Sequence, residues 1–188
     1  RAEGAALAPL LLALPGGQLT EMSIQDAGAE GLDQATAEAV ASLTGLHSLH
    51  LGMDCTAQQL PALLGPLTQL TRLSLGRLAY TGVAVSPAAF SHLTSLRELE
   101  LAQIDLAAGP GLERLTQLTR LWVRGLWLPA HEDAPQPAAE LPLPPALAYL
   151  NVYLDFRSPL PQLLAAQLAP ALAMCTTLTE LNLRTAVG

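Results

Sequence analysis

The sequence contains no lysine, few aromatic residues and little charge. Its nine basic residues are all arginines and face 16 acidic residues, so the formal net charge is −7. Nucleic-acid binding draws much of its affinity from Lys and Arg that neutralise phosphates, and anionic membrane surfaces attract the same residues. The composition therefore argues against nucleic-acid binding and against attachment to an anionic membrane.

An uninterrupted hydrophobic run is also missing, although 51% of the residues are hydrophobic. A transmembrane helix needs roughly 18 or more consecutive apolar residues. The longest candidate, residues 160–174, is broken by Gln162, Gln167 and several prolines. Residues 5–14 could pass for the apolar part of a signal peptide, but their leucines keep the spacing of a helix that precedes a strand. We therefore expect no direct insertion into a membrane.

What the chain does contain is one phrase, Leu-x-x-Leu-x-Leu with conservative replacements, repeated seven times. Within a copy, apolar and polar residues alternate, so that Leu49 and Leu51 point inward while Ser48 and His50 point outward. This alternation predicts one short strand in each copy. The first leucines stand 22 to 31 residues apart, at Leu19, Leu46, Leu70, Leu96, Leu118, Leu147 and Leu178.

The phrase and its period resemble the leucine-rich-repeat family, over the whole of residues 1–188. This resemblance implies a single α/β domain, a right-handed solenoid of about seven repeats with a parallel concave sheet and convex helices and turns. The wording Leu-Thr-x-Leu-x-x-Leu-x-Leu is most similar to the intracellular repeats abundant in green algae.

The chain departs from the family pattern at the third residue after the final apolar residue of each phrase, where the family places Asn or Cys. We expect the backbone groups of this turn to be satisfied by other backbone groups or by water. The seven positions hold Ala27, Asp54, Leu78, Ile104, Leu126, Asp155 and Ala186.

The crossovers between the expected strands carry helix-start signals. Thr36–Leu43 is predicted to be helical, Thr56 and Gln59 resemble a capping box, and the short crossover 105–115 has room only for a turn or a 3₁₀ piece. N-cap serines precede proline at Ser86-Pro87 and Ser158-Pro159. Hydroxyl-to-backbone bonds are expected from Thr44, Thr68, Thr94, Thr116 and Thr176.

The proline-rich segment 127–145 interrupts the repeat pattern, because six prolines exclude a regular helix there. Two interpretations remain open. The segment is either a tolerated surface insertion or a loop that docks a partner, since insertions in solenoids cluster on one face.

Cys55 and Cys175 stand five repeats apart. At about 4.8 Å per stacked strand, this separation is roughly 24 Å, too far for a disulfide. The sequence also lacks an Asn-x-Ser/Thr glycosylation signal. Both features favour an intracellular, cytoplasmic location.

No motif for nucleotide binding, metal binding or nucleophilic catalysis is evident, so we expect neither an enzyme nor a cofactor or metal site. Glu98 and Glu100 are interpreted as members of an ion-pair ladder, with Arg72 and Arg120 flanking Glu98, rather than as a catalytic pair. His47, His50 and Cys55 are not expected to converge on a metal.

The outward positions of the fifth and sixth strands are unusual because they concentrate aromatic residues and arginine. Trp, Tyr and Arg are the types enriched at binding hot spots, so these positions are the candidate partner-binding site. The alternative is that the aromatic rings stack on one another or are covered by the insertion. The candidate residues are Arg120, Trp122, Arg124, Tyr149 and Tyr153.

The favoured function is a non-enzymatic protein–protein interaction module that binds a partner protein on its concave face. One alternative is a structural subunit of a large assembly, held by its edges or convex side. Another is the regulatory or substrate-recognition region of a larger enzyme, such as a ubiquitin ligase or a GTPase-activating protein. Because the chain begins at Arg1, we expect it to be part of a longer protein. Its last layer of leucines should be covered by further repeats or by another subunit.

Overall fold

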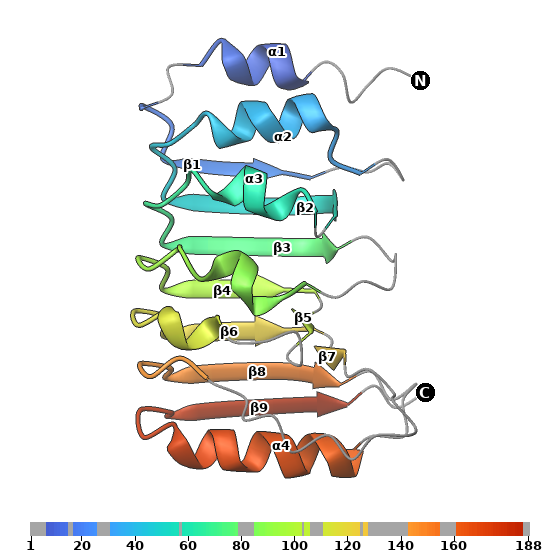
Figure 1. Ribbon diagram of the computed structural model, residues 1–188, viewed down its shortest axis with the longest axis vertical. Helices are drawn as coiled ribbons and strands as arrows, with labels where there is room; N and C mark the ends of the chain where they lie inside the picture. Colours follow the sequence, from blue (N-terminus) through green and yellow to red (C-terminus); the bar gives the residue numbers. More distant parts are fainter. Residues whose placement is uncertain are drawn as a thin grey trace.

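Seven strands form one all-parallel sheet in which every strand lies beside its neighbours in sequence order (Figure 1). The computed structural model describes residues 7–14, 17–25, 31–56, 58–78, 85–102, 104–105, 111–124, 126–127, 143–154 and 161–185. The expected α/β fold of seven sequentially paired strands is therefore confirmed. The strands are β1 (Glu21–Ile24), β2 (Ser48–Cys55), β3 (Arg72–Leu78), β4 (Glu98–Leu101), β6 (Arg120–Val123), β8 (Tyr149–Leu154) and β9 (Glu180–Thr185).

Over the repeated phrase, all six strand pairs share one register, which places equivalent positions side by side. The row that begins at Met22 continues through Leu49, Leu73, Leu99, Leu121, Leu150 and Leu181. On each strand, the residues directly before and after the member of this row point to the opposite face of the sheet. We call the sheet face that bears these outward residues the open face.

Leucine layers between neighbouring repeats form the core. Each inward leucine of an interior strand is covered by the layers before and after it, as expected for a stack of repeats. Leu99, in the middle strand, is 0% exposed, whereas Leu181 and Leu183 of β9 are 41% and 49% exposed. The first leucine of the phrase is fully buried at Leu46, Leu70, Leu96, Leu118 and Leu147.

Short helices and 3₁₀ turns alternate with the strands along the chain (Figure 1). The 3₁₀ turn expected in the crossover 105–115 is present as η4. Among the described helices, none combines the length and the apolar character that crossing a membrane requires. These elements are α1 (Leu7–Leu12), α2 (Gln34–Ala41), α3 (Leu60–Leu64), η2 (Pro87–Phe90), η4 (Leu112–Arg114) and α4 (Pro161–Met174).

Helix α2 begins two residues before the expected Thr36, because Asp33 is the N-cap. The Asp33 carboxylate accepts hydrogen bonds from the Thr36 backbone N–H at 2.8 Å and from its hydroxyl at 2.7 Å. These bonds, the side-chain one foremost, hold the pKa of Asp33 below its usual value. Thr36 thus supports the cap from within the first turn.

The capping box expected at Thr56 is only half formed, and α3 starts later, at Leu60. The Gln59 side-chain oxygen accepts from the Thr56 N–H at 3.0 Å, as in a capping box. The Gln59 amide nitrogen instead donates to the Leu32 carbonyl at 2.9 Å, which joins this crossover to the preceding one.

The N-cap expected at Ser86 is confirmed, because its hydroxyl accepts from the Ala88 N–H at the start of η2. Ser158-Pro159 and residues 128–142 of the proline-rich segment lie outside the described residues.

The threonines that bond to the backbone are not those expected from the sequence. Hydroxyls of Thr71, Thr119 and Thr179 donate to the carbonyls of His47, Arg97 and Ala148, at 3.0, 3.2 and 3.0 Å. These threonines stand at the strand entrance, directly beside a carbonyl of the preceding repeat, whereas Thr44 and its equivalents belong to the turn before it. The bonds therefore link neighbouring repeats rather than closing a local turn.

Backbone pairing takes the place of the missing asparagine, as anticipated. In the fourth and fifth repeats, β5 (Ile104–Asp105) and β7 (Leu126–Trp127) form a second, two-stranded parallel sheet (Figure 1). In the second and third repeats the main sheet itself continues, with Asp54 beside Arg77 after a register shift. These pairings satisfy backbone groups in the turn through the neighbouring repeat.

Both cysteines are free thiols. Cys55 is 1% exposed, and burial raises the pKa of its thiol to about 11. Cys175 is partly exposed, and burial raises its pKa as well. A thiol with a raised pKa holds little of the reactive thiolate at neutral pH.

Replacing Leu99 by Ala is expected to lower the free energy of unfolding by about 2–5 kcal/mol, because a cavity opens between two packed layers. Leu181→Ala is the matched control, since Leu181 occupies the same register position but is 41% exposed. Urea denaturation followed by circular dichroism measures both. Equal losses of stability would show that the end layer is as well packed as the middle one.

Replacing Asp33 by Ala is expected to cost about 1 kcal/mol of stability at pH 7, because the cap of α2 is lost. The lowered pKa of Asp33 means that this contribution is present above the usual carboxyl pKa. It fades as the pH falls through the lower folded-state value. The free energies of unfolding of the unmodified chain and of Asp33→Ala, measured from pH 7 to pH 2, should converge at the acidic end. A gap that persists there would show that the carboxylate charge is not what stabilises the cap.

Candidate functional site

Among the described residues, the open face carries three ion pairs between residues of different strands. Arg120 and Arg124 of β6 pair with Glu98 and Glu100 of β4, the first at 3.4 Å. The expected ladder is therefore present between β4 and β6. Arg72, however, contacts Glu21 at 3.4 Å, two strands away, and not Glu98. Exposed pairs of this kind contribute about 0–1 kcal/mol each, so they add little to the stability of the sheet.

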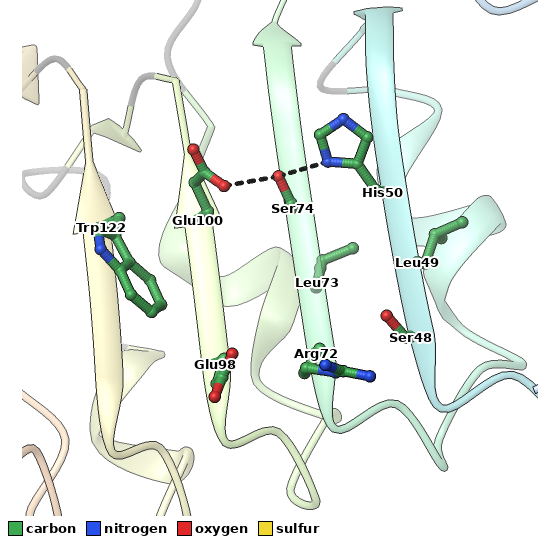
Figure 2. Close-up of a pocket in the computed structure, with 9 residues that line it drawn as sticks. All are labelled: Ser48, Leu49, His50, Arg72, Leu73, Ser74, Glu98, Glu100 and Trp122. Carbon is green, nitrogen blue, oxygen red and sulfur yellow. Dashed lines mark hydrogen bonds between the residues drawn. The ribbon is translucent and has the colours of Figure 1, made fainter. Parts of the chain in front are cut away.

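A hydrogen-bonded chain crosses three strands on the same face. The His50 Nδ1 lies 2.9 Å from the Ser74 hydroxyl, which donates to Glu100 at 2.9 Å (Figure 2). The serine proton is used in the bond to the carboxylate, so its oxygen accepts and His50 Nδ1 donates. Neutral His50 therefore carries its proton on Nδ1. Since Glu100 also accepts from Arg124, the chain extends to β6.

This series of hydrogen bonds runs in the wrong direction for nucleophilic catalysis. An activated serine gives its proton to a base such as histidine, which a carboxylate then orients. Here Ser74 stands between the histidine and the carboxylate and gives its proton to Glu100. The arrangement orders polar side chains across three strands, which is a positioning role.

The aromatic residues of the candidate site are partly stacked. The rings of Trp122 and Tyr149 lie 5.2 Å apart between centroids, tilted by 45°. The Tyr149 hydroxyl accepts from Asn151 at 3.2 Å and from Asn182 at 3.4 Å, and these bonds, that of Asn151 first, lower the pKa of its phenol. Tyr153 is 40% exposed. Stacking of Trp122 on Tyr149, which was one of the two open interpretations, is thus observed.

Two shallow hollows lie on the open face. Glu100 and Trp122 stand between them and line both. The first, of about 270 Å³, contains the His50–Ser74–Glu100 chain (Figure 2). The second, of about 420 Å³, lies over β6, β8 and β9. Its lining consists of Glu100, Trp122, Val123, Arg124, Asn151, Tyr153 and Arg184.

The second hollow unites three of the five expected site residues: Trp122, Arg124 and Tyr153. Arg120 lies outside its lining and pairs with Glu98, while Tyr149 supports Trp122 from the side. Sequence reasoning did not single out the other lining residues. The signal for Arg184 was available, because it follows Tyr153 in the register of the sheet.

The His50–Ser74–Glu100 chain was also missed. These three residues occupy the same position of the phrase in consecutive repeats, so the shared register brings them side by side. Comparing equivalent positions across repeats, rather than searching for motifs along the chain, would have revealed it.

The histidines of the second repeat are engaged in other contacts. His47 Nδ1 lies 2.8 Å from the Gly45 carbonyl, and His50 contacts Ser74. Within the described ranges, no group of three or more His, Cys, Asp or Glu side chains could hold a metal ion. His47 and His50 thus contact different groups, and Cys55 is a buried free thiol.

Comparison with known proteins adds no family assignment: neither a protein-family model nor a curated protein matches this sequence.

Proposed function

We propose that this chain is a leucine-rich-repeat protein that acts, without enzymatic activity, as an intracellular protein-interaction module. Its partner protein binds the open face over β6, β8 and β9. The observation that carries the proposal is the second hollow, of about 420 Å³, where Trp122, Tyr153 and Arg124 meet. These are the residue types that dominate the binding energy of protein interfaces.

Preorganisation supports the same assignment. Glu100 holds Arg124, and the Tyr149 ring supports Trp122. Asn151 and Asn182 in turn hold Tyr149 through its hydroxyl. Side chains that are already positioned lose less conformational entropy when a partner binds, so more of the contact energy remains as affinity.

The charge of the open face favours a protein over a polyanion. Among the described side chains, four arginines stand there with four glutamates, so their charges balance although the whole chain has a net charge of −7. Phosphate recognition requires an excess of positive charge. The eight residues are Arg72, Arg120, Arg124, Arg184, Glu21, Glu98, Glu100 and Glu180.

A second candidate function is a structural subunit held by its edges. It is favoured by one observation: the apolar side chains of Leu181 and Leu183 in β9 and of Met174 in α4 are exposed, Met174 to 83%. An assembly contact at this end would bury them without using the hollow on the open face.

Binding measurements on variants separate the two candidates. Trp122→Ala and Arg124→Ala are each expected to weaken the binding of the partner protein by at least about 2 kcal/mol, or roughly 30-fold in Kd. Ser23→Ala is the matched control for Trp122, because it occupies the equivalent phrase position on β1, away from the hollow. The 188-residue chain serves as bait in a cell extract, and the retained protein is then titrated against each variant.

Unchanged binding by Trp122→Ala and Arg124→Ala, together with loss of binding by Leu183→Asp, would reject the open-face proposal. It would support the structural-subunit alternative.

A further inference from the structure

The two ends of the sheet differ in how their apolar side chains are covered. At the β1 end, Met22 and Ile24 are 8% and 9% exposed and share a core cluster with Leu11 of α1. At the β9 end, the equivalent Leu181 and Leu183 are about half exposed, although α4 lies at the same end of the molecule (Figure 1). Among the described residues no strand pairs with the outer edge of β9, and this edge presents the apolar side chains of Leu181 and Leu183.

The backbone of β9 shows which groups are free to pair. The Glu180 N–H donates to the Ala148 carbonyl at 3.0 Å. Backbone groups alternate in direction along a strand, so Glu180, Asn182 and Arg184 face β8. The N–H and C=O groups of Leu181 and Leu183 consequently face the open edge.

The charged side chains of β9 are also distinctive. Arg72, Arg120 and Arg124 on the interior strands each have a carboxylate partner. In the described part of the chain, neither Arg184 nor Glu180 forms an ion pair, although Glu180 accepts a hydrogen bond from Asn182 at 3.0 Å. The two charges without ion partners are opposite in sign and stand four residues apart on the same face of the edge strand.

We propose that β9 pairs in antiparallel orientation with β9 of a second copy of this chain, about a two-fold axis that passes midway between the Asn182 residues of the two copies. In this register Glu180 stands opposite the second copy's Arg184, and Arg184 opposite the second copy's Glu180. Leu181 and Leu183 face each other across the joint on the core side. The segment Glu180–Arg184 is thus complementary to itself in both charge and apolar character.

The backbone geometry agrees with this register. Leu181 and the second copy's Leu183 form a hydrogen-bonded pair, which uses the groups that face the open edge. Glu180 and Arg184 form non-hydrogen-bonded pairs, in which the side chains of the two strands come closest. A shift of one residue would place Leu181, whose backbone groups face the joint, opposite a residue whose backbone groups face β8, so the hydrogen bonds could not form.

Head-to-tail stacking of β9 on β1 is disfavoured by the same features. The register of the sheet would place Glu180 beside Glu21 of the next copy, a like-charge contact. The inward residues of β1 are already buried. Self-association at β9 alone closes after two copies, whereas head-to-tail contacts would build a filament.

The pairing joins two seven-stranded sheets into one and removes an exposed edge. It is separate from the proposed function, because the second hollow lies on the open face and the joint uses the strand edge. Two copies of the hollow would then lie on one continuous sheet, each beside the joint through Arg184.

Sedimentation velocity of the 188-residue chain over a range of concentrations tests the proposal. The unmodified chain is expected to pass from monomer to dimer without larger species. Glu180→Arg and Arg184→Glu each place two like charges opposite each other, so each should weaken dimerisation about tenfold or more. Arg114→Glu, on η4, is the matched control for charge and should have no effect.

Complementation makes the test specific to the register. An equimolar mixture of Glu180→Arg and Arg184→Glu should form a mixed dimer, because each arginine pair then faces a glutamate pair. The double variant Glu180→Arg/Arg184→Glu should also recover self-association. Circular dichroism verifies that each variant is folded.

Three results would overturn the proposal: a monomer at every concentration, association unaffected by either single variant, or no recovery on mixing. If neither single variant affects association, the contact between the copies is apolar and does not use this register. The third would indicate that a different surface, or a different partner, covers β9.

Discussion

Every leucine layer of this molecule is buried only by the layers on either side of it. In the described part of the chain, the strands of the main sheet pair with their neighbours in chain order, so each layer packs against the repeats before and after it. The consequence is visible along the row from Leu49 to Leu181. Interior members are almost fully buried, and the last one is about half exposed. Stability, the shape of the open face and the open edge all follow from this nearest-neighbour rule.

The same rule builds the candidate site. The shared register places equivalent outward residues of neighbouring repeats one strand spacing apart. Side-chain contacts on the open face therefore form between repeats rather than along the chain. Glu100 illustrates this, because it joins Ser74 from the preceding strand and Arg124 from the following one. The concentration of Trp122 and Tyr149 on adjacent strands likewise becomes a stacked pair.

Strand positions and inward residues could be predicted because the period-two alternation and the repeated leucines leave one buried face. Helix starts were harder to predict. Asp33 and Thr36 are both residue types that can cap a helix, and Asp33 is the N-cap because its carboxylate accepts from the Thr36 N–H. The partner of Arg72 could not be predicted either, since a long exposed side chain can choose among carboxylates of similar energy. The register of the sheet follows from the repeated phrase, but the side-chain contacts that keep Arg120 on Glu98 and outside the hollow do not.

Hydrogen exchange resolved by residue tests the nearest-neighbour account most directly, at a protein concentration too low for self-association. Amides along β3, β4 and β6 should be protected at both odd and even positions, since each strand is paired on both sides. In β9, the amides of Asn182 and Arg184 should be protected, while those of Leu181 and Leu183 should exchange quickly. Equal protection of all four would contradict the account, because the last layer would then be held by something other than its single neighbour.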